Sequence, residues 1–153
     1  MADQITVTGL GKTALSLDYA GLAALPEQIS DVSNLAPGRE GVAVRFEAVL
    51  KAAGVDPSAG FITLEAEGDF AASIPLAPII DQALIWYGLK GGPLPRDKGG
   101  PIRFLIPNPA ACGTADIDQC ANVKWLQSID VSAERGRDVR PSTLRAHEEL
   151  HER

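Results

Sequence analysis

Residues 91–131 read GGPLPRDKGGPIRFLIPNPAACGTADIDQCANVKWLQSIDV, a Gly/Pro-rich turn followed by an apolar strand, a long polar loop and a second apolar segment. Each apolar segment carries one cation: Arg103 lies inside the run Ile102–Pro107, and Lys124 directly precedes Trp125. A charge that starts from largely apolar backbone needs an anionic partner, because burying an uncompensated charge is costly. The sequence therefore predicts that the functional site lies in this stretch.

The composition is typical of one ordinary globular domain. The chain has 153 residues, of which 45% are hydrophobic and 22% charged, and this is enough apolar material for a core. A net charge of -6 argues against a general binder of nucleic acids or anionic membranes, because such proteins need a positive surface field. The N-terminus lacks the pattern of a signal peptide, and no apolar run reaches the roughly 18 residues of a membrane span. We therefore expect a cytoplasmic protein.

The apolar periodicity predicts short strands mixed with short helices. Alternation indicates strands, whereas apolar residues at helical spacing indicate helices that end at Pro26 and Gly54. The expected strands are 4–8, the hairpin 61–67 and 70–76, the buried run 83–89, and the segments 102–106 and 125–131; the expected helices are 17–25 and 44–53. Strands and helices do not alternate regularly, so we expect an α+β fold with a mixed sheet.

The last part of the chain differs from the rest in composition. Residues 134–153 hold five basic and five acidic residues with few large apolar ones, so they cannot build a core. We predict one domain over residues 1–132, followed by a polar C-terminal extension at 133–153 with a helix after Pro141. The segment HEELH at 147–151 matches the HExxH pattern of zinc proteases, but it leaves no downstream room for a third ligand. Zinc is therefore not expected.

Four segments together resemble the molybdopterin-binding domain of the sulfite-oxidase-like oxidoreductases. They are TVTGLGKTALSLDYAGLAALP, GVAVRFEAVLKAAGVDPSAGFITLEAEGDFAASIPL, ALIWYGLKGGPLPRDKGGPIRFLIP and NVKWLQSIDV, and the resemblance covers roughly residues 4–132. The sharpest parts are GGPIRFLIP and NVKWLQSIDV. The resemblance implies a mixed α+β fold with a partly barrel-like core. It also implies a molybdenum cofactor, in which a phosphate-bearing pterin, the molybdopterin, holds molybdenum through its dithiolene.

The resemblance also implies which residues contact the cofactor. The arginine of the GGP-x-R pattern and the segment ending in the VKW lysine contact the phosphate end in the family, and they correspond here to Arg103 and to Asn122, Val123 and Lys124. A guanidinium is a rigid fork for phosphate oxygens, and a lysine adds a mobile point charge. Two further residues are carried over: Lys98, where some relatives have asparagine, and Ser73, in a hairpin region that supplies a hydroxyl near the cofactor.

A purely structural alternative stays open for each of these cations. Arg103 would then pair with a carboxylate such as Asp97 or Asp116, Lys124 would extend along Trp125 towards solvent, and Lys98 would be a solvated turn residue.

The chain departs from the family where the metal is normally attached. Relatives carry a metal-binding cysteine between the segments that correspond to Pro26 and Gly41, and this interval contains none. Ser33 or a neighbour occupies the place, but a hydroxyl is a much poorer ligand than a thiolate for this metal. Cys112 and Cys120 lie in one loop, where free thiols, a disulfide, and a metal or redox site all remain open.

We therefore predict a molybdopterin-binding domain with impaired or altered oxidoreductase catalysis, and no catalytic residue is predicted. The alternative is a non-catalytic module on the same fold that binds another phosphorylated ligand or a protein partner. The expected partner is a small pterin or phosphate ligand, with neither nucleic acid nor membrane, and a protein partner or a second copy of the chain is compatible with the sequence.

Overall fold

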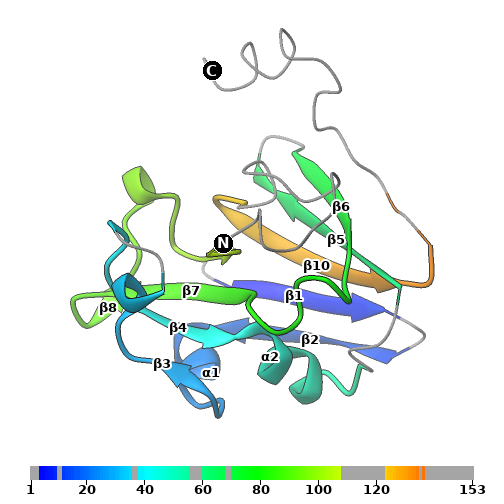
Figure 1. The fold of residues 1–153 in the computed structure, drawn as a ribbon, viewed down its shortest axis with the longest axis horizontal. Coiled ribbons are helices and arrows are strands. Elements are labelled where there is room, and N and C mark those ends of the chain that lie inside the picture. Colours follow the sequence, from blue (N-terminus) through cyan, green and yellow to red (C-terminus); the bar gives the residue numbers. More distant parts are fainter. Residues whose placement is uncertain are drawn as a thin grey trace, which may run out of the picture.

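The computed structural model describes residues 4–9, 12–35, 38–55, 60–67, 70–107, 123–134 and 136. Several predictions concern residues outside these ranges: Asn122, the state of Cys112 and Cys120, and the helix and HEELH segment of the C-terminal extension. The described chain forms two sheets, with two α-helices and two short 3-10 helices among its elements (Figure 1).

The first sheet has five strands in the order β2-β1-β10-β5-β6. Its strands are β1 at Gln4–Gly9, β2 at Lys12–Asp18, β5 at Phe61–Ala66, β6 at Ala71–Pro75 and β10 at Leu126–Ser132. The pairing of β1 with β10 is parallel, and the other pairs are antiparallel. The predicted hairpin is confirmed as β5 and β6. The last strand in the sequence, β10, lies between β1 and β5, so the sheet joins the two ends of the domain (Figure 1).

The second sheet is built around β7. It runs in the order β3-β4-β7-β8, and β9 also pairs with β7, antiparallel. Its strands are β3 at Gln28–Ile29, β4 at Val42–Arg45, β7 at Leu84–Leu89, β8 at Gly92–Pro93 and β9 at Arg103–Leu105. The run that the sequence predicted to be buried is confirmed as β7.

Both helices are shorter than predicted. The α1 helix spans Tyr19–Ala23 and α2 spans Phe46–Ala52. The predicted helix at 17–25 is wrong at its start, because Leu17 belongs to β2, where exposed and more buried side chains alternate along Ala14–Asp18. That alternation has the period of a strand. Asp18 caps the start of α1, since its side chain accepts a hydrogen bond from the amide of Gly21 at 2.8 Å.

The second predicted helix, 44–53, is also wrong at its start. Val44 and Arg45 belong to β4, where they pair with β7, and the helix begins at Phe46. The apolar spacing from Phe46 onward is helical, and four of the seven residues of α2 are buried.

The main core lies between the two sheets, covered by α2. Phe46 of α2 meets Phe104 of β9 edge to face, with ring centroids 5.2 Å apart. A second, smaller cluster lies on the other face of β7, where Leu84 and Trp86 pack with Leu94 and Leu105. The β7 strand is therefore buried on both faces, which explains its continuous apolar sequence. The prediction of an α+β fold with a mixed sheet is confirmed, although the strands described here do not close into a barrel.

Within the described ranges, neither helix has the length and apolarity needed to cross a membrane.

Candidate functional site

Arg103 is placed by the pairing of β9 with β7. It is the first residue of β9, and its register partner on β7 is Trp86. The side chain is only 7% exposed, and its guanidinium carbon lies 5.0 Å from the centroid of the Trp86 ring. Nη1 donates to the backbone carbonyl of Lys98 at 3.0 Å. The burial that the sequence predicted for Arg103 is therefore observed.

The segment that carries Lys124 runs alongside β9. The amide of Phe104 donates to the carbonyl of Val123 at 3.0 Å, and the amide of Leu126 donates to the carbonyl of Ile102 at 3.0 Å. Between these bonds, the amide of Trp125 donates to the carbonyl of Gly99 at 2.7 Å. These three backbone bonds bring Lys124 beside Arg103, although the two residues are separated by a long loop in the sequence.

Gly99 packs against the side chains of both Arg103 and Lys124. It ends the 3-10 helix η3 (Arg96–Lys98) in the left-handed conformation, with φ of 88°. A Cβ at this position would lie 2.8 Å from Cδ of Arg103 and 2.8 Å from Cγ of Lys124. Glycine is needed here both for its backbone angle and for the space that the two side chains occupy.

A pocket of about 380 Å³ opens over these residues. Four cationic and two acidic side chains line it, so the lining has a net charge of +2 in a chain whose net charge is -6. The lining residues are Gly38, Arg39, Glu40, Trp86, Leu89, Asp97, Lys98, Arg103 and Lys124. We call this the cationic pocket.

Arg103 has no carboxylate partner among the described residues. Asp97 lines the same pocket but forms no ion pair with Arg103, so that structural alternative is not observed, while Asp116 lies outside the described ranges. Burial, and then the positive charge of Arg39, lower the pKa of Arg103 to about 10, which leaves the side chain charged at neutral pH. The Nε of Arg103 is buried and has no hydrogen-bond partner among the described residues. A buried charge in this state is normally compensated by a bound group.

The cationic pocket brings together three of the predicted site residues and leaves two others elsewhere. Arg103, Lys98 and Lys124 line it. Val123 is buried instead, and its carbonyl is bound to Phe104. Ser73 lies on β6 of the first sheet, where its hydroxyl accepts from the amide of Gly136 at 2.8 Å, so it does not share the pocket.

Two lining residues were missed by sequence reasoning. Arg39 is half-buried and lies close enough to Arg103 to affect its pKa. It follows Gly38 in the interval between Pro26 and Gly41, where no periodic signal marks it. Trp86 lies in the run 83–89 that was predicted to be buried, and it does pack in the smaller core cluster. Its position opposite Arg103 depends on the strand register, which the sequence does not reveal.

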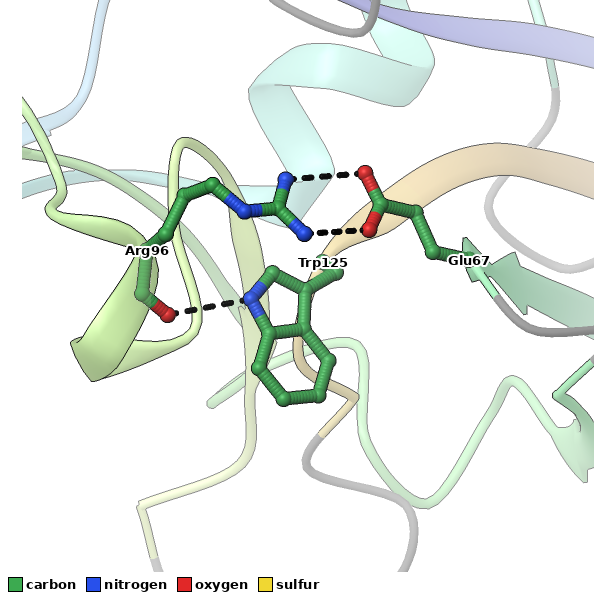
Figure 2. A network of polar contacts seen from close by, with 3 residues as sticks. All are labelled: Glu67, Arg96 and Trp125. Carbon is green, nitrogen blue, oxygen red and sulfur yellow. Dashed lines mark hydrogen bonds and ion pairs between the residues drawn. The ribbon is translucent and has the colours of Figure 1, made fainter.

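An ion-paired cluster includes the residues next in sequence to two lining residues, Asp97 and Lys124 (Figure 2). Arg96 of η3 donates from both terminal nitrogens to the carboxylate of Glu67, at 2.9 and 2.5 Å. The indole of Trp125 donates to the backbone carbonyl of Arg96 at 3.0 Å. This cluster ties the end of β5 to η3 and to the residue after Lys124, and we call it the Arg96–Glu67 clamp.

A second pocket, of about 490 Å³, adjoins the first and shares Glu40 and Leu89 with it. Ser33, the residue expected where relatives carry a metal-binding cysteine, lines this second pocket. Its hydroxyl donates to Oδ1 of Asp31 at 2.6 Å. The described residues hold no group of three or more His, Cys, Asp and Glu side chains that could bind a metal on their own.

The fold is similar to that of a known protein. The computed structure is similar to the crystal structure of the sulfane dehydrogenase SoxCD from Paracoccus pantotrophus, with a TM-score of 0.64 at 15% identity, over 93% of this chain and 41% of that one. At that identity the likeness concerns the fold alone.

The sequence is similar to mitochondrial sulfite oxidases. It is 37% identical to those of Rattus norvegicus and Homo sapiens over 68 residues, and 39% identical to that of Drosophila melanogaster over 66 residues. The matched region is 41–42% of this chain but only 10–11% of those proteins. The chain thus corresponds to a small part of each of these relatives.

A family model, the oxidoreductase molybdopterin binding domain, matches residues 40–139. This range begins at Glu40 of the cationic pocket and includes β7, η3, β9 and the segment of Lys124. The chain therefore belongs to the oxidoreductase molybdopterin binding domain family, and the cofactor that this membership implies is a molybdopterin.

Proposed function

We propose that the cationic pocket binds the phosphate end of a molybdopterin cofactor, with Arg103, Lys98 and Lys124 as its ligands. The observation that carries the proposal is the state of Arg103, which is 7% exposed, has no described carboxylate partner and keeps a buried Nε without an acceptor. A phosphate supplies what this side chain lacks, because it offers two negative charges and several acceptor oxygens.

The three side chains would contribute differently. Arg103 is held by Trp86 and the carbonyl of Lys98, so it offers a pre-oriented guanidinium. Lys98 and Lys124 are exposed and extend from flexible stems, so they would follow the phosphate as point charges. The net charge of +2 in the lining favours an anion of about -2 over a neutral group. When bound, the cofactor supplies the redox chemistry, while the protein binds and orients it.

We further propose that catalysis is impaired or altered relative to relatives that use a thiolate. The second pocket adjoins the phosphate site and contains Ser33, whose hydroxyl hydrogen is already committed to Asp31. Residues 27–40 contain no cysteine that could supply the soft ligand. The same observation favours the alternative function, a non-catalytic module that binds a phosphorylated ligand or a protein partner through the same pocket.

The test is a direct analysis of what the protein carries. The whole chain is produced in a host that makes molybdenum cofactor, and the purified protein is analysed for molybdenum and for the fluorescent oxidised pterin. We expect stoichiometric pterin in the wild type and strongly reduced pterin in Arg103→Ala. Pterin without molybdenum would support cofactor binding with a defect at the metal end. A wild-type protein without pterin would refute cofactor binding and leave the module that binds another ligand.

Two other expectations stay predictions. One is the cytoplasmic location, and the other is the division into a domain at 1–132 and an extension at 133–153. An association with a protein partner or a second copy likewise stays a prediction.

A further inference from the structure

Two buried side-chain nitrogens of the described chain have no hydrogen-bond partner, and both belong to residues that line the cationic pocket. They are Nε of Arg103 and Nε1 of Trp86. Trp86 is only 3% exposed, and the two residues are register partners on β9 and β7. An indole N–H buried without an acceptor is unusual, because such donors are nearly always satisfied by protein, water or ligand. Because the two residues are register partners that line one pocket, a single bound group near them would be a candidate acceptor for both nitrogens.

The backbone beside the indole does not supply that acceptor. Gly41 packs against the nitrogen edge of the ring, and a Cβ there would lie 2.9 Å from Nε1. Its carbonyl instead accepts from the amide of Val32 at 2.9 Å. Gly41 has φ of 125°, which favours glycine, so the backbone can pack closely against the nitrogen edge of the indole.

We propose that Trp86 is a ligand-binding residue of the cationic pocket: its ring face holds the guanidinium of Arg103, and its Nε1–H donates to an oxygen of the same anionic group. This inference rests on the proposed function and extends it to a residue that the sequence assigned to the core. The acceptor has the chemistry of a phosphate, since it must satisfy a neutral donor and compensate a cation together.

The choice of an aromatic partner for Arg103 has a physical reason. A carboxylate beside Arg103 would neutralise it and repel an incoming phosphate. The face of an indole attracts a cation without carrying a full negative charge, so Arg103 keeps its charge for the ligand. Arg39 adds a second positive charge nearby, which an anionic ligand compensates and a neutral ligand does not.

The first experiment follows the indole directly. Inorganic phosphate is titrated into the ¹⁵N-labelled full chain, purified without cofactor, while the side-chain N–H signals of the two tryptophans are recorded by NMR. The Trp86 signal is identified as the one missing in Trp86→Phe. We expect it to shift with the same saturation curve as binding measured by calorimetry. Saturable binding with an unmoved Trp86 signal would refute the donor role.

The second experiment uses a matched pair of variants on β7. Trp86→Phe removes one N–H but keeps an aromatic face, and Tyr87→Phe removes one O–H from the neighbouring residue, which packs in the main core on the opposite face. We expect Trp86→Phe to weaken phosphate binding about tenfold, as for one hydrogen bond to a charged group. Tyr87→Phe should change the affinity for phosphate by less than about twofold. Equal affinities for wild type and Trp86→Phe would overturn the proposal.

The outcomes separate this inference from the function on which it rests. If the wild type binds neither phosphate nor pterin, both fail. If the wild type binds phosphate, and Arg103→Ala abolishes this binding but Trp86→Phe does not, only the proposed role of Trp86 fails. Trp86→Leu, which removes the ring face as well, should weaken binding more than Trp86→Phe, and an equal loss in both would remove the ring-face part of the proposal.

Discussion

Arg96 and Arg103 lie seven residues apart in the sequence, yet they are in opposite electrostatic states. Arg96 is exposed and forms the bidentate ion pair with Glu67 shown in Figure 2. The hydrogen bonding and the negative charge of Glu67 raise the pKa of Arg96. Arg103 is buried, has no described carboxylate partner and has a lowered pKa. Arg96 is compensated by a carboxylate of the protein, whereas Arg103 has no described carboxylate and is the arginine for which we propose a ligand.

The largest expected effect is the difference in ligand affinity between substitutions of the two arginines. Arg103→Ala should weaken binding of inorganic phosphate or of the phosphorylated pterin by about 1.5–3 kcal/mol, the range for hydrogen bonds to charged groups. The free energy of unfolding without ligand should fall little or even rise, because a buried, uncompensated charge is removed. Calorimetry of binding and urea unfolding of the same preparation measure both quantities.

Arg96→Ala is the matched control for this experiment. It removes an arginine whose charge is already paired outside the pocket lining, so ligand affinity should stay within about twofold, the size of a minor surface effect. If both substitutions weaken binding equally, the distinction between the two arginines is wrong.

A smaller effect is expected from crowding the two pocket cations. In Gly99→Ala the new methyl would lie 2.8 Å from Cδ of Arg103, so the side chain must move. We expect ligand affinity to fall about tenfold, which corresponds to about 1.4 kcal/mol. Gly54→Ala is the control, since Gly54 also has a positive φ, 72°, but nothing lies within 4 Å of its Cβ position.

Both glycine variants should lose about 1–2 kcal/mol of stability from backbone strain. Only Gly99→Ala should lose affinity, as measured by calorimetry with inorganic phosphate. Unchanged affinity in Gly99→Ala would show that the spacing between Arg103 and Lys124 is not critical.

The smallest effect concerns the clamp. The hydrogen bond and the charge of Arg96 lower the pKa of Glu67, so the contribution of Glu67 to stability is present above the unfolded-state pKa and is lost as the pH falls through the folded-state pKa. Glu67→Gln should therefore unfold slightly more easily than wild type at pH 7, and the difference should disappear in acid. Urea unfolding at pH 7 and at about pH 3 measures this. If the stability difference persisted in acid, it would come from the changed shape of the side chain and not from its lost charge.

Part of this site could be predicted from the sequence. A single charged residue inside an apolar run predicts a buried cation, and Arg103 is one. The motif of Lys124 follows from the resemblance, and the structure brings it beside Arg103 through the backbone bonds of Gly99 and Val123. Local sequence patterns were therefore informative where a residue needs a particular kind of partner, as a buried cation does.

Other features depend on tertiary contacts that a sequence pattern does not encode. Arg39 is a pocket residue because the chain at 38–40 lines the pocket, and Trp86 faces Arg103 because of the register of β7 and β9. The start of the helix predicted at 17–25 was wrong because the pattern along residues 14–18 has the period of a strand. Ser73 was assigned to the cofactor region, whereas the structure places its hydroxyl against the chain after β10.

The central position of β10 affects when the protein can first bind a ligand. This strand, Leu126–Ser132, inserts between β1 and β5, and Lys124 lies just ahead of it. During synthesis, the pairing of β1 with its parallel neighbour must wait until residue 132 has left the ribosome. The cationic pocket is therefore incomplete until the segment of Lys124 and β10 has been synthesised, and the proposed ligand would be taken up only after that point.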